Sequence, residues 1–185
     1  MAHEHLIEKK IAAETIYKGK IITLELQTVT LPNGKEAQRE VVLHPGAVTV
    51  LAITNEDNVL LVRQFRKPTD RLLIETPAGK LEHGENPLEA VKRELEEETG
   101  YTAKEWKHLN SFYTSPGFAD ELMHAYVATD LKKLEQKLDD DEFLDVIEAS
   151  AEDVQQMLAD GEIYDAKTLA LVYWWLAERA KQGKA

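Results

Sequence analysis

Alternating apolar and polar residues open the chain and predict β-strands. Between residues 15 and 31 the alternation has the period of two that half-buried strands show. Residues 32–34, Pro-Asn-Gly, predict a tight turn, and residues 34–44 return as a hairpin partner. This opening forms either a small antiparallel sheet or an extension of the main sheet, and the polar residues 1–10 before it are expected to fray.

The apolar, β-branched run over residues 47–54 predicts a buried strand, because strands covered on both faces lose the alternation. Further strands are predicted over residues 59–66, 72–76 and 121–131. The last third of the chain is expected to be helical. Ser150 is a suitable N-cap and Gly161 a suitable stop for one helix, and a longer helix follows over residues 165–183.

The apolar residues of the longer helix predict which of its faces packs on the core. Trp174 and Trp175 are adjacent, so they cannot both face one way. One is expected to pack inward while the other reaches a second surface, with a dimer contact as the alternative to core packing. The expected core face consists of Leu169, Val172, Tyr173 and Leu176.

The best-defined element in the sequence is a helix over residues 87–99. Asn86 is a good N-cap, and Pro87 suits the first helical position. Glu89 completes the spacing of a capping box with Asn86. Gly100 suits the position just past the helix, where a left-handed backbone is common.

The glutamates of this helix divide into two groups by their angle around the axis. At about 100° per residue, Glu94, Glu97 and Glu98 lie together beside the apolar stripe, whereas Glu89 and Glu96 lie on a separate, solvated face. Three carboxylates in one place repel one another unless solvent or cations screen them. Hard cations such as Mg²⁺ and Mn²⁺ prefer oxygen ligands, so the cluster is either a metal site or an ordinary charged face.

Composition narrows the classes of function. The 185 residues are 43% apolar, which suffices for one domain with a sizeable core, and the absence of cysteine excludes disulfides and thiolate chemistry and favours the cytoplasm. The net charge of −12 disfavours nucleic acid and anionic membranes. Neither a signal peptide nor a transmembrane helix is expected. A phosphate-bearing substrate stays compatible with this charge, because divalent cations reverse the local field.

The stretch over residues 79–101 resembles the Nudix box, G-x5-E-x7-R-E-U-x-E-E-x-G-U, in which U is aliphatic. Its fixed letters and gaps are met by Gly79, Glu85, Arg93, Glu94, Leu95, Glu97, Glu98 and Gly100. Tyr101 departs from the pattern, which usually has Ile, Leu or Val there. An aromatic ring can still pack at that position. The resemblance gives Arg93 and Glu85 a structural role, as an ion pair that braces the loop against the helix.

The same resemblance implies hydrolysis of a nucleoside diphosphate linked to another moiety, with Mg²⁺ or Mn²⁺ as cofactor. It makes Glu94 and Glu98 the main metal ligands, with Glu97 shared or bridging and counted among the catalytic residues. It also makes the backbone carbonyl of Ala78 a metal ligand. The chemistry explains the need for cations, because a pyrophosphate is anionic and repels hydroxide.

Three residues outside the box resemble residues that are typical of the ADP-ribose pyrophosphatase branch of the family. Pro116 follows Gly100 at about the distance that marks this branch. Arg66 ends a Gln-Phe-Arg segment and is expected to contact phosphate, while Glu75 lies just before Pro-Ala-Gly and is expected to contact adenine or its neighbourhood. From the residues alone, the basic end of that strand fits either an anion site or a solvated strand end.

An acidic run over residues 139–142 offers a candidate catalytic base. In similar enzymes a glutamate of this loop precedes phenylalanine, which favours Glu142, with Asp140 and Asp141 as rivals. From the residues alone, such a run is more often a solvated loop.

Together these features predict an α/β fold, a Nudix α/β/α sandwich with a mixed sheet over residues 46–185, preceded by a small antiparallel β region over residues 1–45. In the branch it resembles, such an N-terminal part is commonly exchanged between subunits, so a homodimer is expected. The expected reaction converts ADP-ribose and water to AMP and ribose 5-phosphate. The alternatives are hydrolysis of another nucleoside diphosphate sugar or a dinucleotide, and a non-catalytic nucleotide sensor.

Overall fold

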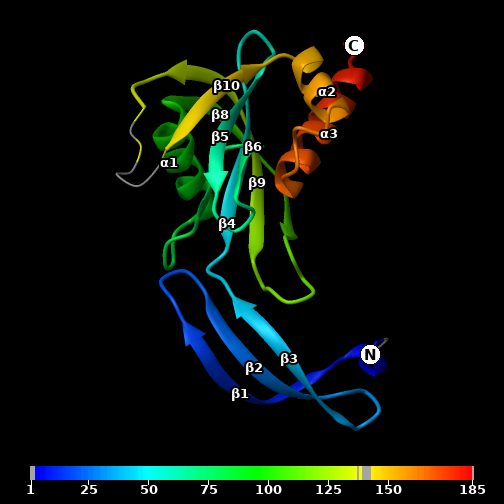
Figure 1. Ribbon diagram of the computed structural model, residues 1–185. Coiled ribbons are helices and arrows are strands. Elements are labelled where there is room, and N and C mark those ends of the chain that lie inside the picture. Colours follow the sequence, from blue (N-terminus) through cyan, green and yellow to red (C-terminus); the bar gives the residue numbers. More distant parts are fainter. Residues whose placement is uncertain (1–2, 137, 139–142, 185) are drawn as a thin grey trace. The chain divides into compact units, whose positions relative to one another are not determined.

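The computed structural model describes residues 3–136, 138 and 143–184, and Figure 1 labels most of their elements. Their contacts divide the chain into two compact units. The first comprises residues 1–46 and 113–122, and the second comprises residues 47–112 and 123–185. The first unit thus contains a segment from much later in the chain than the expected region of residues 1–45.

The first unit is built on an antiparallel sheet of β1 (Lys9–Lys18), β2 (Thr23–Thr30) and β3 (Glu36–Leu43). The predicted turn closes the β2–β3 hairpin, where the Leu31 amide donates to the Lys35 carbonyl at 2.8 Å. Since this sheet is separate from the larger one, the first of the two expected arrangements is the observed one.

Two features of the first unit were not expected from the sequence. A short 3₁₀ helix (η1, Glu4–Leu6) and the start of β1 at Lys9 lie within the stretch expected to fray, so that expectation is wrong for these residues. The segment over residues 113–122 also joins this unit. The Val42 amide donates to the Phe118 carbonyl at 2.8 Å, and the Val42 carbonyl accepts from the Asp120 amide at 3.1 Å.

The second unit contains a mixed sheet whose described strands run in the order β10-β5-β4-β9-β8, with β6 paired to β5 and β7 to β4. β4 pairs parallel with β9 and antiparallel with β5 and β7. The bounds are β4 (Ala47–Ile53), β5 (Val59–Arg66), β6 (Arg71–Glu75), β7 (Ala78–Lys80), β8 (Tyr101–Tyr113), β9 (Leu122–Lys133) and β10 (Leu144–Ala149).

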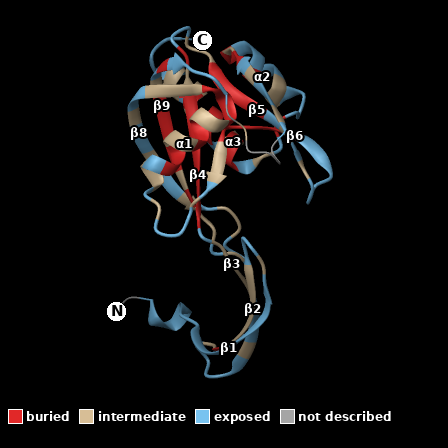
Figure 2. Ribbon diagram, turned by 90° about the vertical axis from the view of Figure 1, so that its left-hand side faces the viewer, coloured by how far each residue is buried: buried red, intermediate tan, exposed pale blue. Residues whose placement is uncertain are grey.

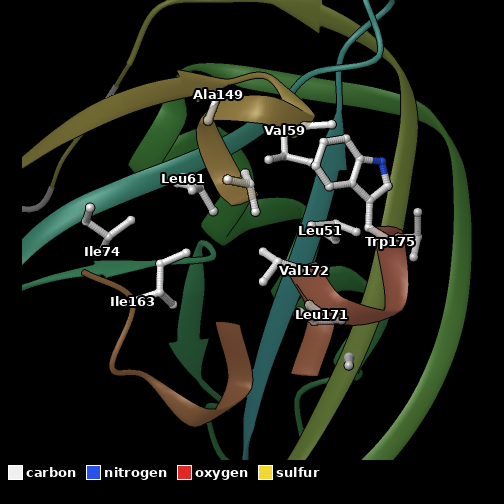
Figure 3. Packing of buried hydrophobic residues seen from close by; sticks show 13 residues of the cluster. Leu51, Val59, Leu61, Ile74, Ala149, Ile163, Leu171, Val172 and Trp175 are labelled. Carbon is white, nitrogen blue, oxygen red and sulfur yellow. The ribbon is translucent and has the colours of Figure 1, made fainter. Parts of the chain in front are cut away.

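Helices cover both faces of the mixed sheet, and each face has its own cluster of buried apolar residues. On one face α2 (Ala151–Ala159) and α3 (Ala166–Lys181) pack on the sheet, and Figure 3 shows Leu171, Val172 and Trp175 of α3 against sheet residues such as Leu51. On the other face α1 (Pro87–Thr99) packs Val91 and Leu95 against Val48 and Val50. Figure 2 shows buried residues gathered along these strands. The predicted α/β/α sandwich with a mixed sheet is confirmed.

The ends of α1 follow the predicted signals, with one exception. The Asn86 side chain accepts from the Leu88 amide at 2.9 Å, and Gly100 has φ 70°, a left-handed conformation that favours glycine. Glu89 instead pairs with Lys92 at 2.8 Å, so the capping box expected for this helix is absent from the contacts of these described residues. A full capping box does form at α2, which Ser150 and Asp153 close.

The core face of α3 differs from the expected one. Trp175 is buried and Trp174 packs partly against the same cluster, so one of the two rings does point inward. Tyr173, however, is 57% exposed, so its assignment to the core was wrong. Within the described part of the chain, no helix combines the length and apolar character that crossing a membrane requires.

Candidate active site

The box begins where β7 runs against α1, and this contact leaves no room for a side chain at Gly79. A Cβ built there would overlap the Glu94 carboxylate, far inside the 3.0 Å below which real Cβ atoms essentially never lie. Gly79 also pairs with Val48 of the central strand β4, so its backbone is anchored on the other side. The glycine therefore lets the strand approach a buried carboxylate closely, and a side chain there would have to displace that carboxylate.

Glu98 lies one helical turn beyond Glu94 and contacts the residue before Gly79. The Ala78 amide donates to Glu98 Oε2 at 3.0 Å, and Glu98 is only 2% exposed. Two carboxylates of α1 thus face the short loop-strand segment 78–79 from within the protein. This placement agrees with the angular prediction that they flank the buried stripe.

Arg93 connects the remaining acidic residues of the box. Its Nη1 donates to Glu94 Oε1 at 2.8 Å and to Glu97 Oε2 at 2.9 Å. Its Nε and Nη2 each contact a Glu85 carboxylate oxygen at 3.3 Å, which confirms the predicted ion pair between loop and helix. Burial lowers the pKa of Arg93, but the hydrogen bond with Glu85 and the charge of Glu94 outweigh it, so the guanidinium stays charged.

The guanidinium of Arg93 also offsets the repulsion expected among the helix glutamates. It lies between Glu94 and Glu97, so a fixed cation already screens two of the three carboxylates. Among the residues that the structure describes, no three acidic or histidine side chains meet closely enough to enclose a metal ion. Glu94 and Glu98 nevertheless present their carboxylates to the 78–79 segment, and Arg93 links Glu97 to Glu94. Carboxylates are hard oxygen donors of the kind that suit Mg²⁺ or Mn²⁺.

A second charged cluster joins the ends of β5 and β6 to the start of α3. Glu75 accepts from Arg66 through Nε at 2.7 Å and Nη2 at 2.8 Å, a bidentate pair. The Lys167 ammonium donates to Glu75 Oε2 at 2.5 Å and lies 2.9 Å from Asp165 Oδ2. Glu75 is 2% exposed, whereas the Arg66 side chain is 39% exposed. The arginine is therefore anchored on its buried edge while part of it remains open to solvent.

The electrostatics of this cluster favour the charged forms of Glu75 and Arg66. Burial raises the pKa of Glu75, but hydrogen bonds from Arg66 and the charge of Lys167 prevail and lower it to about 2. The hydrogen bonds with Glu75 raise the pKa of Arg66, and the charge of Glu98 raises it further. Arg66 is thus within electrostatic reach of Glu98, a glutamate of the box.

Buried hydroxyl groups hold the segment between the two clusters. The Thr76 amide donates to Thr168 Oγ1 at 2.8 Å, and the Thr168 hydroxyl donates to Asp165 at 2.6 Å. Thr76 Oγ1 lies 2.9 Å from Thr49 Oγ1, whose hydroxyl donates to the Pro77 carbonyl at 3.1 Å. The backbone that leads from Glu75 to Ala78 is therefore fixed from both sides.

The structure gathers most of the predicted site residues into the second unit. Arg66, Glu75, Ala78 and the three box glutamates all lie there. Pro116 belongs to the first unit, in the segment 113–122, and is not among the residues that the second unit brings together. Glu142 lies outside the described residues, as do its rivals Asp140 and Asp141. Their assignment stays a prediction.

The interpretation of the sequence missed Lys167, together with the threonines that hold residues 75–77. Lys167 is 8% exposed and occupies the first turn of α3, just after the N-cap Asp165. A cation there opposes the positive end of the helix dipole. A lysine in the first turn of a predicted helix is unfavourable, so Lys167 could have been noticed in the sequence as a candidate functional residue.

Comparison with protein families assigns nearly the whole chain. Residues 43–172 match the NUDIX domain. Residues 8–42 match the nucleoside diphosphate sugar hydrolase N-terminal domain.

Individual relatives cover almost the full length. The chain is 51% identical to a Bacillus subtilis protein named ADP-ribose pyrophosphatase, over 97% of this chain and 98% of the relative. It is 49% identical to a Bacillus methanolicus methanol dehydrogenase activator, over 94% and 96%. A Klebsiella pneumoniae GDP-mannose pyrophosphatase is 35% identical, over 92% and 90%.

A solved structure has the same fold. The crystal structure of an ADP compounds hydrolase superposes with a TM-score of 0.84, over 96% of this chain and 97% of that one, at 23% identity.

Proposed function

This chain belongs to the NUDIX family of hydrolases, and we propose that it hydrolyses the diphosphate bond of ADP-ribose to give AMP and ribose 5-phosphate. The observation that carries this choice of substrate is the 51% identity, over nearly the whole of both chains, to a relative that bears the name ADP-ribose pyrophosphatase. The complete set of box residues supports hydrolysis, since each of them lies in the second unit with the geometry described above.

We propose that Glu94, Glu97 and Glu98, with the carbonyl of Ala78, hold Mg²⁺ or Mn²⁺. Glu94 and Glu98 are buried against the 78–79 segment, and Gly79 leaves the space in which the carboxylate of Glu94 lies. A bound divalent cation supplies positive charge at the diphosphate and acidifies the attacking water. Arg93 holds Glu94 and Glu97 in place for that task.

The remaining roles follow from charge and position. Arg66 steadies the diphosphate with the part of its guanidinium that is open to solvent, because Glu75 occupies the buried edge. Glu75, which holds Arg66, contacts adenine or its neighbourhood, and Pro116 is a further substrate-binding residue. Glu142 assists the attack of water by accepting its proton, and Glu97 contributes to catalysis as a metal ligand.

We further propose that the chain acts in the cytoplasm as a homodimer through its N-terminal β region. All residues of β1 are exposed, among them Ile11, Ile16 and Tyr17, each more than half exposed. Apolar side chains in such number on one strand favour burial against another subunit.

Two other functions draw on specific observations. The GDP-mannose relative supports a nucleoside diphosphate sugar other than ADP-ribose. The activator relative supports a role in stimulating a dehydrogenase, which adding this chain to a methanol dehydrogenase assay would test. A non-catalytic sensor is disfavoured, because a sensor has no need for the full set of carboxylates.

A substrate panel tests the proposal. ADP-ribose, ADP-glucose, GDP-mannose, NADH and Ap4A are each incubated with the chain and Mg²⁺, and phosphate is measured after phosphatase treatment. The proposal predicts the highest kcat/KM for ADP-ribose. Preference for GDP-mannose would transfer the assignment to the sugar nucleotide alternative, and no turnover of any compound would favour the sensor.

A further inference from the structure

The first turn of α3 carries a buried lysine that the stability of the fold does not explain. Lys167 is 8% exposed, and a cation in the first helical turn faces the positive end of the helix dipole. Buried ion pairs contribute little net stability, because desolvation offsets the attraction. An apolar residue of similar volume would suit this position as well or better, so the reason for the ammonium group lies in what it touches.

Lys167 touches the carboxylate that anchors Arg66. Its Nζ donates to Glu75 Oε2 at 2.5 Å, the same oxygen that accepts from Arg66 Nη2 at 2.8 Å. Glu75 Oε1 accepts from Arg66 Nε at 2.7 Å. The lysine and the arginine therefore hold one buried carboxylate from two sides, and Glu75 cannot turn without breaking one of these contacts.

The charges in this cluster balance only when Lys167 is present. Arg66 and Lys167 carry positive charge, and Glu75 and Asp165 carry negative charge. Loss of the lysine leaves two carboxylates and one guanidinium in the cluster. That arrangement weakens the attraction of Arg66 for an anionic diphosphate.

Thr168, next to Lys167, also attaches the start of α3 to the segment after β6. Thr168 accepts from the Thr76 amide at 2.8 Å, so consecutive residues of α3 hold consecutive residues of the chain, Glu75 and Thr76. The start of α3 is thereby fixed to the segment that leads into the box. The helix start and the arginine act as one rigid unit.

We propose that Lys167 is a positioning residue of the substrate site: it fixes Glu75, Glu75 fixes the Nε–Nη2 edge of Arg66, and Arg66 presents Nη1 to the diphosphate. Among the described residues, Nη1 of Arg66 makes no hydrogen bond, which leaves it available to an anion. This role rests on the proposed function, but it requires only that the substrate contains a phosphoanhydride, as all the candidate substrates do.

The test is a double-mutant cycle on KM that pairs Lys167→Met with Glu75→Gln. Lys167→Met is expected to raise KM about tenfold, the effect of one charge-assisted hydrogen bond, while kcat changes less than threefold. In the Glu75→Gln background the same change is expected to alter KM less than twofold, because the lysine acts through that carboxylate. Glu75→Gln leaves no unpaired buried charge when the lysine is removed, so the double variant is expected to fold.

Matched variants separate positioning from loss of fold. Lys181→Met removes a lysine of the same helix whose side chain is 71% exposed, and it is expected to leave KM unchanged. Lys167→Arg keeps the charge and is expected to restore most of the affinity. If Lys167→Met does not give a cooperative thermal transition, Lys167→Gln takes its place in the cycle.

Two results would overturn the proposal. One is an unchanged KM in Lys167→Met, and the other is an equal rise of KM in both backgrounds, which a merely structural lysine would give. Failure of the proposed function would be seen separately, in the wild-type chain, as preference for a compound other than ADP-ribose. The cycle is then run with that compound, because the diphosphate is common to all of them.

Discussion

Replacement of Gly79 by alanine tests the close contact at the centre of the site. The added Cβ would overlap the Glu94 carboxylate, and restoring a 3.0 Å separation requires a shift of about 1 Å. The strand cannot withdraw freely, because Gly79 pairs with Val48 on β4. The shift therefore falls on Glu94, which is buried and held by Arg93 at 2.8 Å.

The expected loss of activity is larger than the expected loss of stability. Displacing a catalytic group by about 1 Å costs on the order of a hundredfold in rate, so kcat of Gly79→Ala with ADP-ribose and Mg²⁺ should fall by about that factor. Overpacking of this kind costs about 1–3 kcal/mol. For a chain of this size each kcal/mol lowers Tm by about 2–4 °C, so the variant should still fold at assay temperature.

A control variant distinguishes the displaced carboxylate from general destabilisation. Gly183 has φ 72°, and a Cβ added there would meet no atom within 4 Å, so Gly183→Ala introduces backbone strain of about 1 kcal/mol without touching the site. It should keep full kcat. A kcat of Gly79→Ala within twofold of the wild type, with both variants melting cooperatively, would show that this contact does not position Glu94 for catalysis.

The remaining predictions concern the carboxylates. Glu98→Gln should abolish hydrolysis while circular dichroism shows an intact fold, and wild-type turnover would remove Glu98 from the metal site. Glu142→Gln should lower kcat at least a hundredfold, within the range of general base catalysis; if it keeps full turnover while Asp140→Asn or Asp141→Asn loses it, the base is misassigned. Because its partners lower the pKa of Glu75 from 4.5 to about 2, the stability that it contributes is complete above about pH 4.5 and is lost as the pH falls toward 2. Thermal melts over that window should show a smaller loss for Glu75→Gln than for the wild type.

Local signals made much of the fold predictable. Asn86 and Gly100 mark the ends of α1 because capping depends on residues within one turn of each other. The regular angle per residue of a helix also predicted that Glu94 and Glu98 lie on a different face from Glu89. In the structure Glu94 and Glu98 are buried and Glu89 is exposed. Where two local partners compete, the prediction failed: Glu89 pairs with Lys92 rather than closing a capping box.

Tertiary contacts explain what the sequence could not reveal. The expected face of α3 and the observed one have the same helical spacing but differ by one position, so Tyr173 points outward while Trp175 is buried. Helical periodicity alone does not choose between neighbouring faces, because the sheet decides which one packs. The pair of Lys167 and Glu75 joins residues 92 positions apart, and nothing local in either segment indicates the partner.

The most direct test of the account is product analysis of ADP-ribose incubated with the wild-type chain. With Mg²⁺ present, ion-exchange chromatography should show AMP and ribose 5-phosphate in equal amounts, and EDTA should stop the reaction until Mg²⁺ is restored. Intact ADP-ribose under conditions in which the same sample consumes GDP-mannose, or conversion that continues undiminished in EDTA, would contradict the account.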